Sequence, residues 1–337
     1  MKKVLLLVSV LLFAFTLVGC DSDDGVVTIG ANIYNFDDNF MNGVVKPELI
    51  RYAEEKEVEL ELVDSAGSQA TLNDQVDTFI TKGVDVLAIN LVDPAAASTI
   101  IAKAKEADIP LVLFNKESTV DGAMDTYDKV WYVGTDSAEA GIIQGEMMLA
   151  DWKANTDWDK NNDGILDYVL LKGEPGHPDA EARTLEAVKA FTDDGVTVNE
   201  LGLQPSAAWS TADANNTMAA WLDTAWAADI ELVICNNDGM AFGAIQAMGA
   251  KGVDIPVYGV DALTEALTKI GSGDMNGTVL NDGVNQARAT IDLAINAANG
   301  EEDVTTGTTW TLDSATGTKA VRVAYVAVTA DNYTDFQ

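Results

Sequence analysis

The chain has 337 residues, and its 54 acidic and 20 basic side chains give a formal net charge of −34. Such a charge argues against a nucleic acid or an anionic membrane surface as a partner, because each of these is itself a polyanion. With 47% hydrophobic residues, two cysteines and one histidine, the composition excludes a disulfide scaffold and most histidine-based or metal-based catalysis, and it favours an acidic globular binding protein.

The N-terminal segment is typical of a secretory signal. Two lysines precede an apolar run over 4–18, which is shorter than the roughly 20 residues that a membrane span needs. The sequence LVGC over 17–20 resembles the end of a bacterial lipoprotein signal, in which Cys20 would be lipidated; a plain signal peptide is the alternative. We therefore expect a signal peptide over 1–19, an acidic tether over 20–25, and an extracytoplasmic protein, in the periplasm or lipid-anchored at the outer face of the cytoplasmic membrane.

From residue 26 onward, short β-branched runs alternate with segments of helical period. Strands are expected over 26–29, 58–63, 86–89, 111–114, 130–133, 168–171, 196–201, 232–235, 257–260 and 278–280. Helices are expected over 43–57, 72–82, 95–107 and 138–153, and between the later strands. This alternation indicates parallel sheets covered on both faces. Two sets of five or six strands favour two doubly wound α/β lobes, and a single (β/α)₈ barrel is the alternative.

Motifs of the common α/β enzymes are missing from the sequence. No G-x-x-x-x-G-K-[ST] or G-x-G-x-x-G follows an expected strand, and no G-x-S-x-G occurs. Cys235 lies in an apolar run, where a buried, unreactive thiol is expected. These features count against a nucleotide-binding or hydrolytic enzyme.

Polar and aromatic residues gather where the expected strands end. These segments are 34–40, 115–116, 173–183, 236–238, Asp261 and 281–282. In open α/β sheets, ligands bind beyond the carboxyl ends of the strands, and both halves of the chain contribute here, so we expect a site in a cleft between two lobes. Amides, carboxylates, one arginine and aromatic rings suit an uncharged ligand with many hydroxyl groups.

Some of these residues also have interpretations that involve no ligand. Asn-Asn-Asp over 236–238 is also a common helix cap, and Asp179 with Arg183 has the spacing of an exposed ion pair. His177 could act as a general base, but no serine or cysteine nucleophile is identifiable beside it, so a hydrogen-bonding role is the better hypothesis.

Residues 159–167 match the first nine positions of an EF-hand calcium loop. Oxygen ligands stand at the required positions, namely Asp159, Asn161, Asp163, Ile165 through its backbone carbonyl, and Asp167. Position twelve is Leu170 instead of glutamate, and a strand follows instead of a helix. The loop is therefore either an acidic turn or a structural calcium site that is completed by a glutamate from another segment.

Several long motifs resemble the bacterial galactose/glucose-binding proteins. They are the loop 159–167 followed by LLKGEPGHPDAEART over 170–184, NLVDP over 90–94, YVGTD over 132–136 and VDAL over 260–263. The similarity extends from about Ile29 to Asn332, which is nearly the whole chain after the expected signal.

The resemblance implies a periplasmic-binding-protein fold, in which two doubly wound parallel-sheet lobes are joined by a three-crossing hinge. The N-terminal lobe would comprise 26–134 and 282–322. The C-terminal lobe would comprise 135–281 and 323–337 and would carry the calcium loop. The missing calcium ligand would be Glu231, which comes from a later strand.

The family's sugar contacts also transfer to this sequence. The matching positions are Tyr34, Asp38, Phe40, Asn115, His177, Asp179, Arg183, Trp209, Asn237, Asp261 and Asn281. Phe40 and Trp209 would cover the two faces of a pyranose ring, and the polar residues would bind its hydroxyl groups. The lipoprotein-like signal, Phe36 in place of a tyrosine, and the segment 205–208 depart from the family pattern, which leaves the preference between glucose and galactose open.

The resemblance implies a monomeric binding protein of an ABC sugar importer and not an enzyme. Its partners would be a monosaccharide, a permease and, as a further candidate, a chemoreceptor, with structural Ca²⁺ as the bound ion. A sensor that presents a sugar or furanosyl signal to a receptor is the main alternative. The effector core of a repressor shares the fold, but it requires a basic helix-turn-helix where this chain has a signal-like segment.

Overall fold

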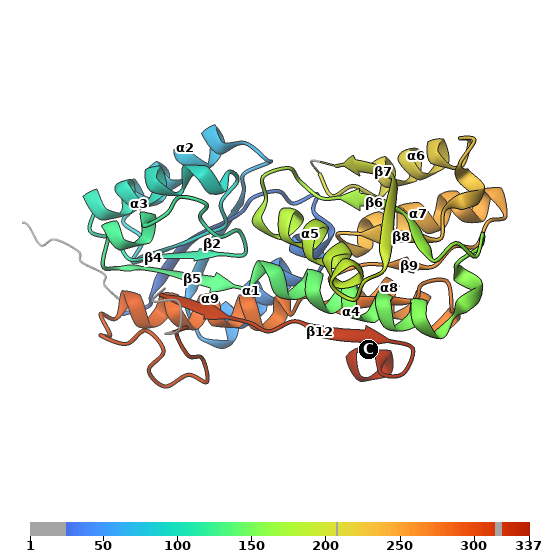
Figure 1. Cartoon of the computed structure of the whole chain (residues 1–337). Helices are drawn as coiled ribbons and strands as arrows, with labels where there is room; N and C mark the ends of the chain where they lie inside the picture. Colours follow the sequence, from blue (N-terminus) through green and yellow to red (C-terminus); the bar gives the residue numbers. More distant parts are fainter. Residues whose placement is uncertain (1–24, 207, 314–318) are drawn as a thin grey trace, which may run out of the picture.

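Two six-stranded sheets, each flanked by helices, make up the computed structural model, which describes residues 25–206, 208–313 and 319–337 (Figure 1). The expected signal over 1–19 and the lipidation residue Cys20 lie outside the described residues. Two separate open sheets replace the single closed barrel that the sequence left as an alternative.

The sheet of the N-terminal lobe has the strand order β11-β5-β4-β3-β1-β2, and all its neighbouring strands are parallel. Its strands are β1 Thr28–Ile33, β2 Glu59–Asp64, β3 Val86–Ile89, β4 Leu111–Phe114, β5 Val130–Gly134 and β11 Ala320–Arg322. Its helices are the π-helix η1 Met41–Val45, then α1 Lys46–Glu55, α2 Gln69–Lys82, α3 Ala97–Glu106 and α9 Gly283–Ala298.

The sheet of the C-terminal lobe has the order β12-β10-β9-β8-β6-β7. Its strands are β6 Ile165–Lys172, β7 Thr197–Pro205, β8 Leu232–Cys235, β9 Val257–Tyr258, β10 Gly277–Leu280 and β12 Val326–Thr329. Its helices are α4 Ser137–Ala154, α5 Pro178–Asp193, α6 Thr211–Trp221, α7 Asp238–Lys251 and α8 Thr264–Ser272. Short 3₁₀ turns lie at Pro94–Ala96, Ala123–Thr126, Thr156–Trp158, Ala227–Asp229 and Tyr333–Phe336.

Local sequence explains why these elements form and where they end. All four residues of β3, and all four of β4, are buried, as expected for continuous apolar strands with helices on both faces. Helix α2 begins after Ser68, whose Oγ accepts a hydrogen bond from the backbone N–H of Thr71, and it ends at Gly83, whose φ of 76° suits glycine.

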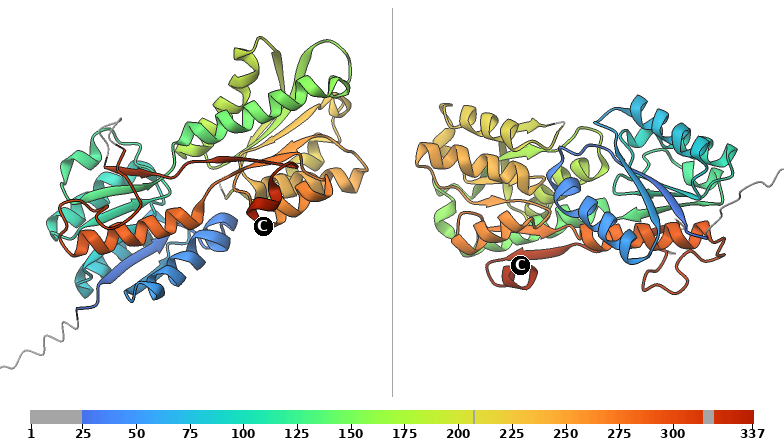
Figure 2. Two further views of the ribbon diagram at one scale, coloured as in Figure 1. Left: turned by 90° about the horizontal axis from the view of Figure 1, so that it is seen from below. Right: turned by 180° about the vertical axis from the view of Figure 1, so that it is seen from behind.

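The chain passes between the two sheets three times, at 135–136, 281–282 and 323–325. Figure 2 shows the last of these segments running from one lobe to the other between β11 and β12. The predicted fold class, two doubly wound lobes with a three-crossing hinge, is confirmed. One strand differs from the expected parallel order: β12 is antiparallel to β10, because β10 leads the chain out of the C-terminal lobe and β12 leads it back in.

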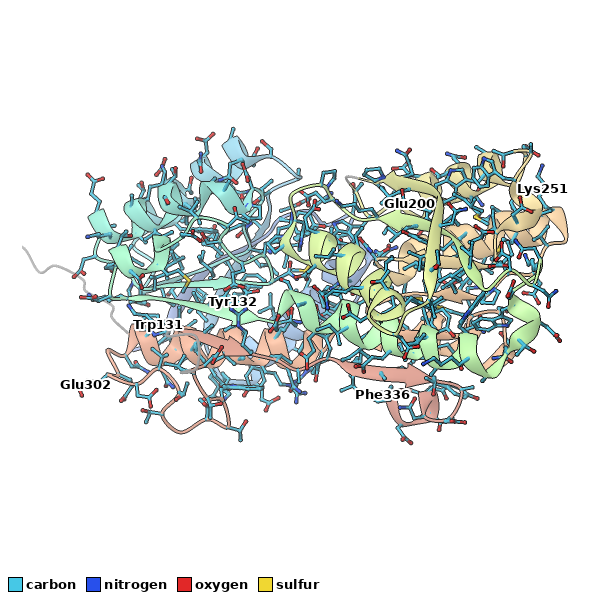
Figure 3. The ribbon with its side chains drawn as sticks, viewed as in Figure 1. Trp131, Tyr132, Glu200, Lys251, Glu302 and Phe336 are labelled. Carbon is cyan, nitrogen blue, oxygen red and sulfur yellow. The ribbon has the colours of Figure 1, made fainter. Side chains whose placement is uncertain are left out.

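Charged side chains lie on the outside of both lobes. Lys251 and Glu302 lie at the periphery in Figure 3, and the side chains of Glu54, Asp193 and Glu200 are exposed as well. In the part of the chain that the structure describes, no helix has the length and apolar character needed to cross a membrane.

Candidate functional site

A small cavity lies between the lobes at the carboxyl ends of the strands, with an empty volume of about 330 Å³. Its lining contains all eleven predicted sugar-contact residues and one addition, Met41; the full set is Tyr34, Asp38, Phe40, Met41, Asn115, His177, Asp179, Arg183, Trp209, Asn237, Asp261 and Asn281. The structure therefore brings the predicted residues together around one cavity.

Both lobes contribute to the cavity. Tyr34, Asp38, Phe40 and Met41 follow β1, and Asn115 follows β4, all in the N-terminal lobe. The C-terminal lobe supplies the others from the end of β6 and the first turns of α5, from the turn before α6, and from the ends of β8, β9 and β10. This is the edge of the sheets at which ligands of open α/β folds bind.

The carboxylate of Asp38 is held by its own segment. Tyr34 donates its hydroxyl to Asp38 Oδ2 at 2.6 Å, and the backbone N–H of Met41 donates to Oδ1 at 2.7 Å. Burial raises the pKa of Asp38, while the hydrogen bonds from Met41 and Tyr34 and the nearby charge of Lys116 lower it. The group is thus a fixed acceptor that faces the cavity.

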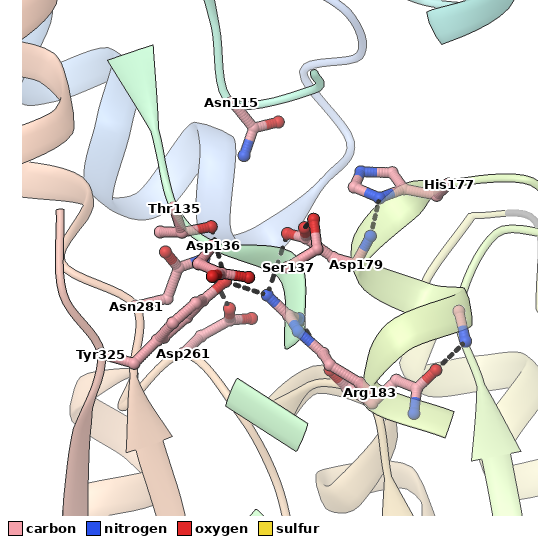
Figure 4. A network of polar contacts seen from close by, with 12 residues as sticks. Asn115, Thr135, Asp136, Ser137, His177, Asp179, Arg183, Asp261, Asn281 and Tyr325 are labelled. Atoms are coloured by element: carbon pink, nitrogen blue, oxygen red, sulfur yellow. Dashed lines mark hydrogen bonds and ion pairs between the residues drawn. The ribbon is translucent and has the colours of Figure 1, made fainter. Parts of the chain in front are cut away.

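Arg183 is the centre of a buried polar network that reaches the hinge (Figure 4). It donates to the backbone carbonyl of Asn236 at 2.9 Å, to Asp179 Oδ2 at 3.2 Å and to the hydroxyl of Tyr325 at 2.9 Å. The Tyr325 hydroxyl also lies 3.0 Å from Thr135 Oγ1. Burial by itself lowers the pKa of Arg183, but Tyr325, Asp179 and Asp261 raise it, so the guanidinium stays charged. The charged side chain of Arg183 is therefore linked through the Tyr325 hydroxyl to two of the three crossing segments, 135–136 and 323–325.

His177 is oriented as a hydrogen-bond donor. Its Nδ1 accepts the backbone N–H of Asp179 at 3.1 Å, which leaves Nε2 to carry the ring proton. Burial lowers the pKa of His177 to about 3, with Asp179 acting against this shift. So weak a base is poorly suited to proton abstraction, and the geometry favours the hydrogen-bonding role over the catalytic one.

Aromatic rings and strained backbone complete the cavity. The rings of His177 and Trp209 meet edge to face with centroids 5.2 Å apart. Asn115, Trp209 and Asp261 have φ values of 60°, 53° and 122°, which non-glycine residues rarely adopt. Such conformations concentrate at functional sites, where the surrounding structure holds them in place.

Two residues beside the cavity were not in the predicted set. Lys116 directly follows Asn115, and its ammonium lies 3.8 Å from the centroid of the Tyr34 ring. Tyr325 reaches the site from the third crossing. The position of Lys116 at a strand end was a usable signal, whereas nothing in the local sequence around Tyr325 indicates contact with Arg183.

The acidic loop 159–167 folds around its own carboxylates. Asp159 accepts the backbone N–H of Asp163 at 3.1 Å through Oδ1 and that of Gly164 at 2.9 Å through Oδ2. Glu231, at the start of β8, accepts the N–H of Lys160 at 2.7 Å and that of Asp167 at 3.0 Å. Burial raises the pKa of Glu231, and the charges of Asp167 and Asp159 raise it further. Within the described residues, no group of three or more His, Cys, Asp or Glu side chains has a geometry that could hold a metal ion.

Two open α/β lobes that enclose a polar, aromatic-lined cavity define a two-lobed solute-binding protein. The model of the periplasmic binding protein domain family matches residues 29–302. The chain belongs to the periplasmic-binding-protein family, and it is therefore an extracytoplasmic binding protein and not an enzyme.

Relatives and solved structures agree with this assignment. The D-galactose/methyl-galactoside binding periplasmic protein of Haemophilus influenzae is 47% identical over 309 residues, which cover 91% of each chain. The ribose import binding protein of Bacillus subtilis is 27% identical over 75% of each chain. A Bacillus halodurans ABC transporter solute binding protein, solved with bound myo-inositol, superimposes with a TM-score of 0.76 at 27% identity, covering 94% of this chain and 98% of that one. The predicted similarity to galactose/glucose-binding proteins is confirmed.

Proposed function

We propose that this chain is the substrate-binding protein of an ABC sugar importer and that it encloses D-galactose or D-glucose between its lobes. The observation that carries the proposal is the cavity itself: it gathers aromatic rings, carboxylates, amides and one arginine from both lobes. The 47% identical relative, whose name states that it binds D-galactose and methyl-galactoside, supports the choice of sugar.

The chemistry of the lining suits an uncharged sugar. Carboxylates such as Asp38 and Asp261 accept hydrogen bonds from hydroxyl groups, and the amides of Asn237 and Asn281 both donate and accept. The buried Nε of Arg183 has no partner among the described residues, and a sugar oxygen would satisfy it. The faces of Phe40 and Trp209 would cover the C–H surfaces of the ring.

Titration calorimetry with D-galactose and D-glucose tests this function, with Asp38→Asn as the site variant. Loss of a charged acceptor costs about 1.5–3 kcal/mol, or roughly ten- to hundredfold in affinity. Asp37→Asn is the matched control, because Asp37 is the exposed neighbour outside the cavity, and it should bind as the unmodified protein does. Absence of heat with both sugars at millimolar concentration would refute the proposal.

The loop 159–167 would hold a structural Ca²⁺, with ligands from Asp159, Asn161, Asp163, Ile165, Asp167 and Glu231. Their carboxylates do not form a metal-binding group in the structure, so they would have to turn toward the ion on binding. Support comes from the crowding of Glu231 against Asp167 and Asp159, which a cation would relieve. Bound calcium would stiffen the connection into β6, whose far end carries the 173–183 segment of the cavity.

Chelation tests the calcium proposal. Removing calcium should lower the melting temperature of the unmodified protein, and Glu231→Gln should remove most of that difference. Asp157→Asn is the control, because Asp157 is exposed and just outside the loop. A melting temperature that is unchanged by chelator would show that the loop is only an acidic turn.

Lipidation of Cys20 and delivery to a permease complete the proposed function, with the protein acting as a monomer. Cys20→Ser should release the protein from membranes in a fractionation experiment. A sensor that presents its ligand to a chemoreceptor or receptor kinase is the alternative, and it would share the cavity. Loss of labelled galactose uptake after deletion of this chain identifies the transport role, whereas intact uptake with a lost response to galactose identifies the sensor.

A further inference from the structure

One ion pair joins the two lobes beside the cavity. Lys116 follows β4 in the N-terminal lobe, Glu174 follows β6 in the C-terminal lobe, and Lys116 Nζ lies 2.6 Å from Glu174 Oε2. Every other ion pair among the described residues lies within a single lobe. Because its partners stand on opposite sides of the cleft, this pair needs closed lobes.

Lys116 also contacts the wall of the cavity. Its ammonium lies 3.8 Å from the centroid of the Tyr34 ring and donates to the carbonyl of Val92 at 3.2 Å. A cation over an aromatic face is attracted to the ring, most strongly where water is excluded. Tyr34 in turn donates to Asp38, so Lys116 supports a cavity residue as well as the contact between lobes.

The two partners of the ion pair differ in how deeply their side chains are buried. The side chain of Lys116 is 1% exposed, whereas that of Glu174 is 25% exposed. Burial lowers the pKa of Lys116, and the charge of Glu174 raises it again. A buried charge is tolerated when its partner is present and is costly when the partner is removed. The closed form therefore depends on Glu174 more than on Lys116.

We propose that Lys116 and Glu174 form a latch that holds the closed cleft around its ligand, and that Lys116 is a positioning residue for Tyr34. This inference rests on the proposed sugar-binding function. The latch acts on the lifetime of the closed state, so it changes the rate at which the sugar leaves more than the rate at which it enters.

The test is a double-mutant cycle on the full-length protein with Glu174→Met, Lys116→Met and the combined variant. Stopped-flow measurement of tryptophan fluorescence gives the association and dissociation rates of D-galactose. We expect Glu174→Met to raise the dissociation rate at least tenfold and Lys116→Met to raise it less. The combined variant should dissociate more slowly than Glu174→Met alone, because no unpaired ammonium remains. Association rates should stay within about twofold of the unmodified protein.

Lys172→Met is the matched control. Lys172 pairs with Glu181 at 2.5 Å in the same region of the chain, but both residues belong to the C-terminal lobe. Its dissociation rate should stay within about twofold of the unmodified protein. Additive effects of the two latch variants, or an unchanged dissociation rate in Glu174→Met, would overturn the proposal.

Small-angle scattering separates failure of the latch from failure of the sugar proposal. Because the pair bridges the lobes directly, Glu174→Met should have a larger mean radius of gyration than the unmodified protein whether or not sugar is added. Equal radii under both conditions would overturn the latch even if no tested sugar binds. Absence of sugar binding by the unmodified protein would instead overturn the proposed function.

Discussion

Gly173 allows Trp209 to lie against the wall of the cavity. A Cβ atom at Gly173 would stand 2.1 Å from Cζ3 of Trp209 and 2.2 Å from Cη2. Ordinary van der Waals contacts begin at about 3.4 Å, so the ring of Trp209 must move by roughly 1.3 Å to accept a methyl group. The φ of Gly173 lies outside the left-handed region, so alanine strains only this contact.

Gly173→Ala should therefore weaken sugar binding through Trp209. Displacing an aromatic face forfeits about 0.5–1.5 kcal/mol of stacking. The shifted ring also narrows the small cavity that Trp209 lines, which raises the expected loss to at least tenfold in affinity. Calorimetry with D-galactose measures this loss, and thermal unfolding shows whether the fold survives.

Two controls make the result specific. In a Trp209→Ala background, Gly173→Ala should cost little more, because the ring it displaces is absent. Gly249→Ala in α7 meets no atom within 4 Å and should leave affinity unchanged. Unchanged affinity in Gly173→Ala, or equal losses with and without the Trp209 ring, would refute the steric argument.

Two further predictions concern stability. The pKa of His177, about 3 in the folded protein, is far below its ordinary value near 6.5, so the unfolded chain takes up a proton that the folded chain does not. The free energy of unfolding should therefore fall as the pH drops below about 6.5, and this group contributes at most about 1.4 kcal/mol per pH unit. Chemical denaturation between pH 4.5 and 7 should show a smaller pH dependence of the unfolding free energy in His177→Asn than in the unmodified protein. An equal pH dependence in the two proteins would contradict the assignment. Ser68→Ala removes the N-terminal cap of α2 and should destabilise the protein by about 1 kcal/mol. Sugar affinity should stay unchanged in this variant, and a loss of affinity would show that α2 is coupled to the cleft.

Sequence patterns located the strands that alternate with helices but missed β11 and β12. The runs 86–89 and 111–114 coincide with β3 and β4, since a strand that is buried on both faces must be continuously apolar. Strands β11 and β12 were missed because both follow the last segment of regular strand–helix alternation, and each pairs with a strand far away in sequence. Their position depends on the hinge, which no local pattern encodes.

The cavity residues were predictable because the carboxyl ends of parallel strands meet at one edge, and the family motif fixed the individual positions. The residues beside the cavity that the motif did not predict, Lys116 and Tyr325, are placed by contacts between segments that lie far apart in the sequence. The pairing of Lys116 with Glu174 depends on how the two lobes lie against each other, and the contact of Tyr325 with Arg183 depends on the path of the third crossing. Neither distance follows from spacing along the chain.

The charges of the cavity explain why an uncharged ligand suits so acidic a chain. Both cations at the cavity are already paired, Arg183 with Asp179 and Lys116 with Glu174. Among the residues that the structure describes, Asp38 and Asp261 have no ion-pair partner, and burial raises the pKa of each because their charge is poorly solvated. A sugar phosphate or uronic acid would add a further negative charge beside them, and the described part of the chain has no unpaired cation at the cavity to meet it. A neutral sugar instead offers hydroxyl donors to both carboxylates. The charges of the cavity therefore favour neutral over anionic sugars, whichever contacts distinguish galactose from glucose.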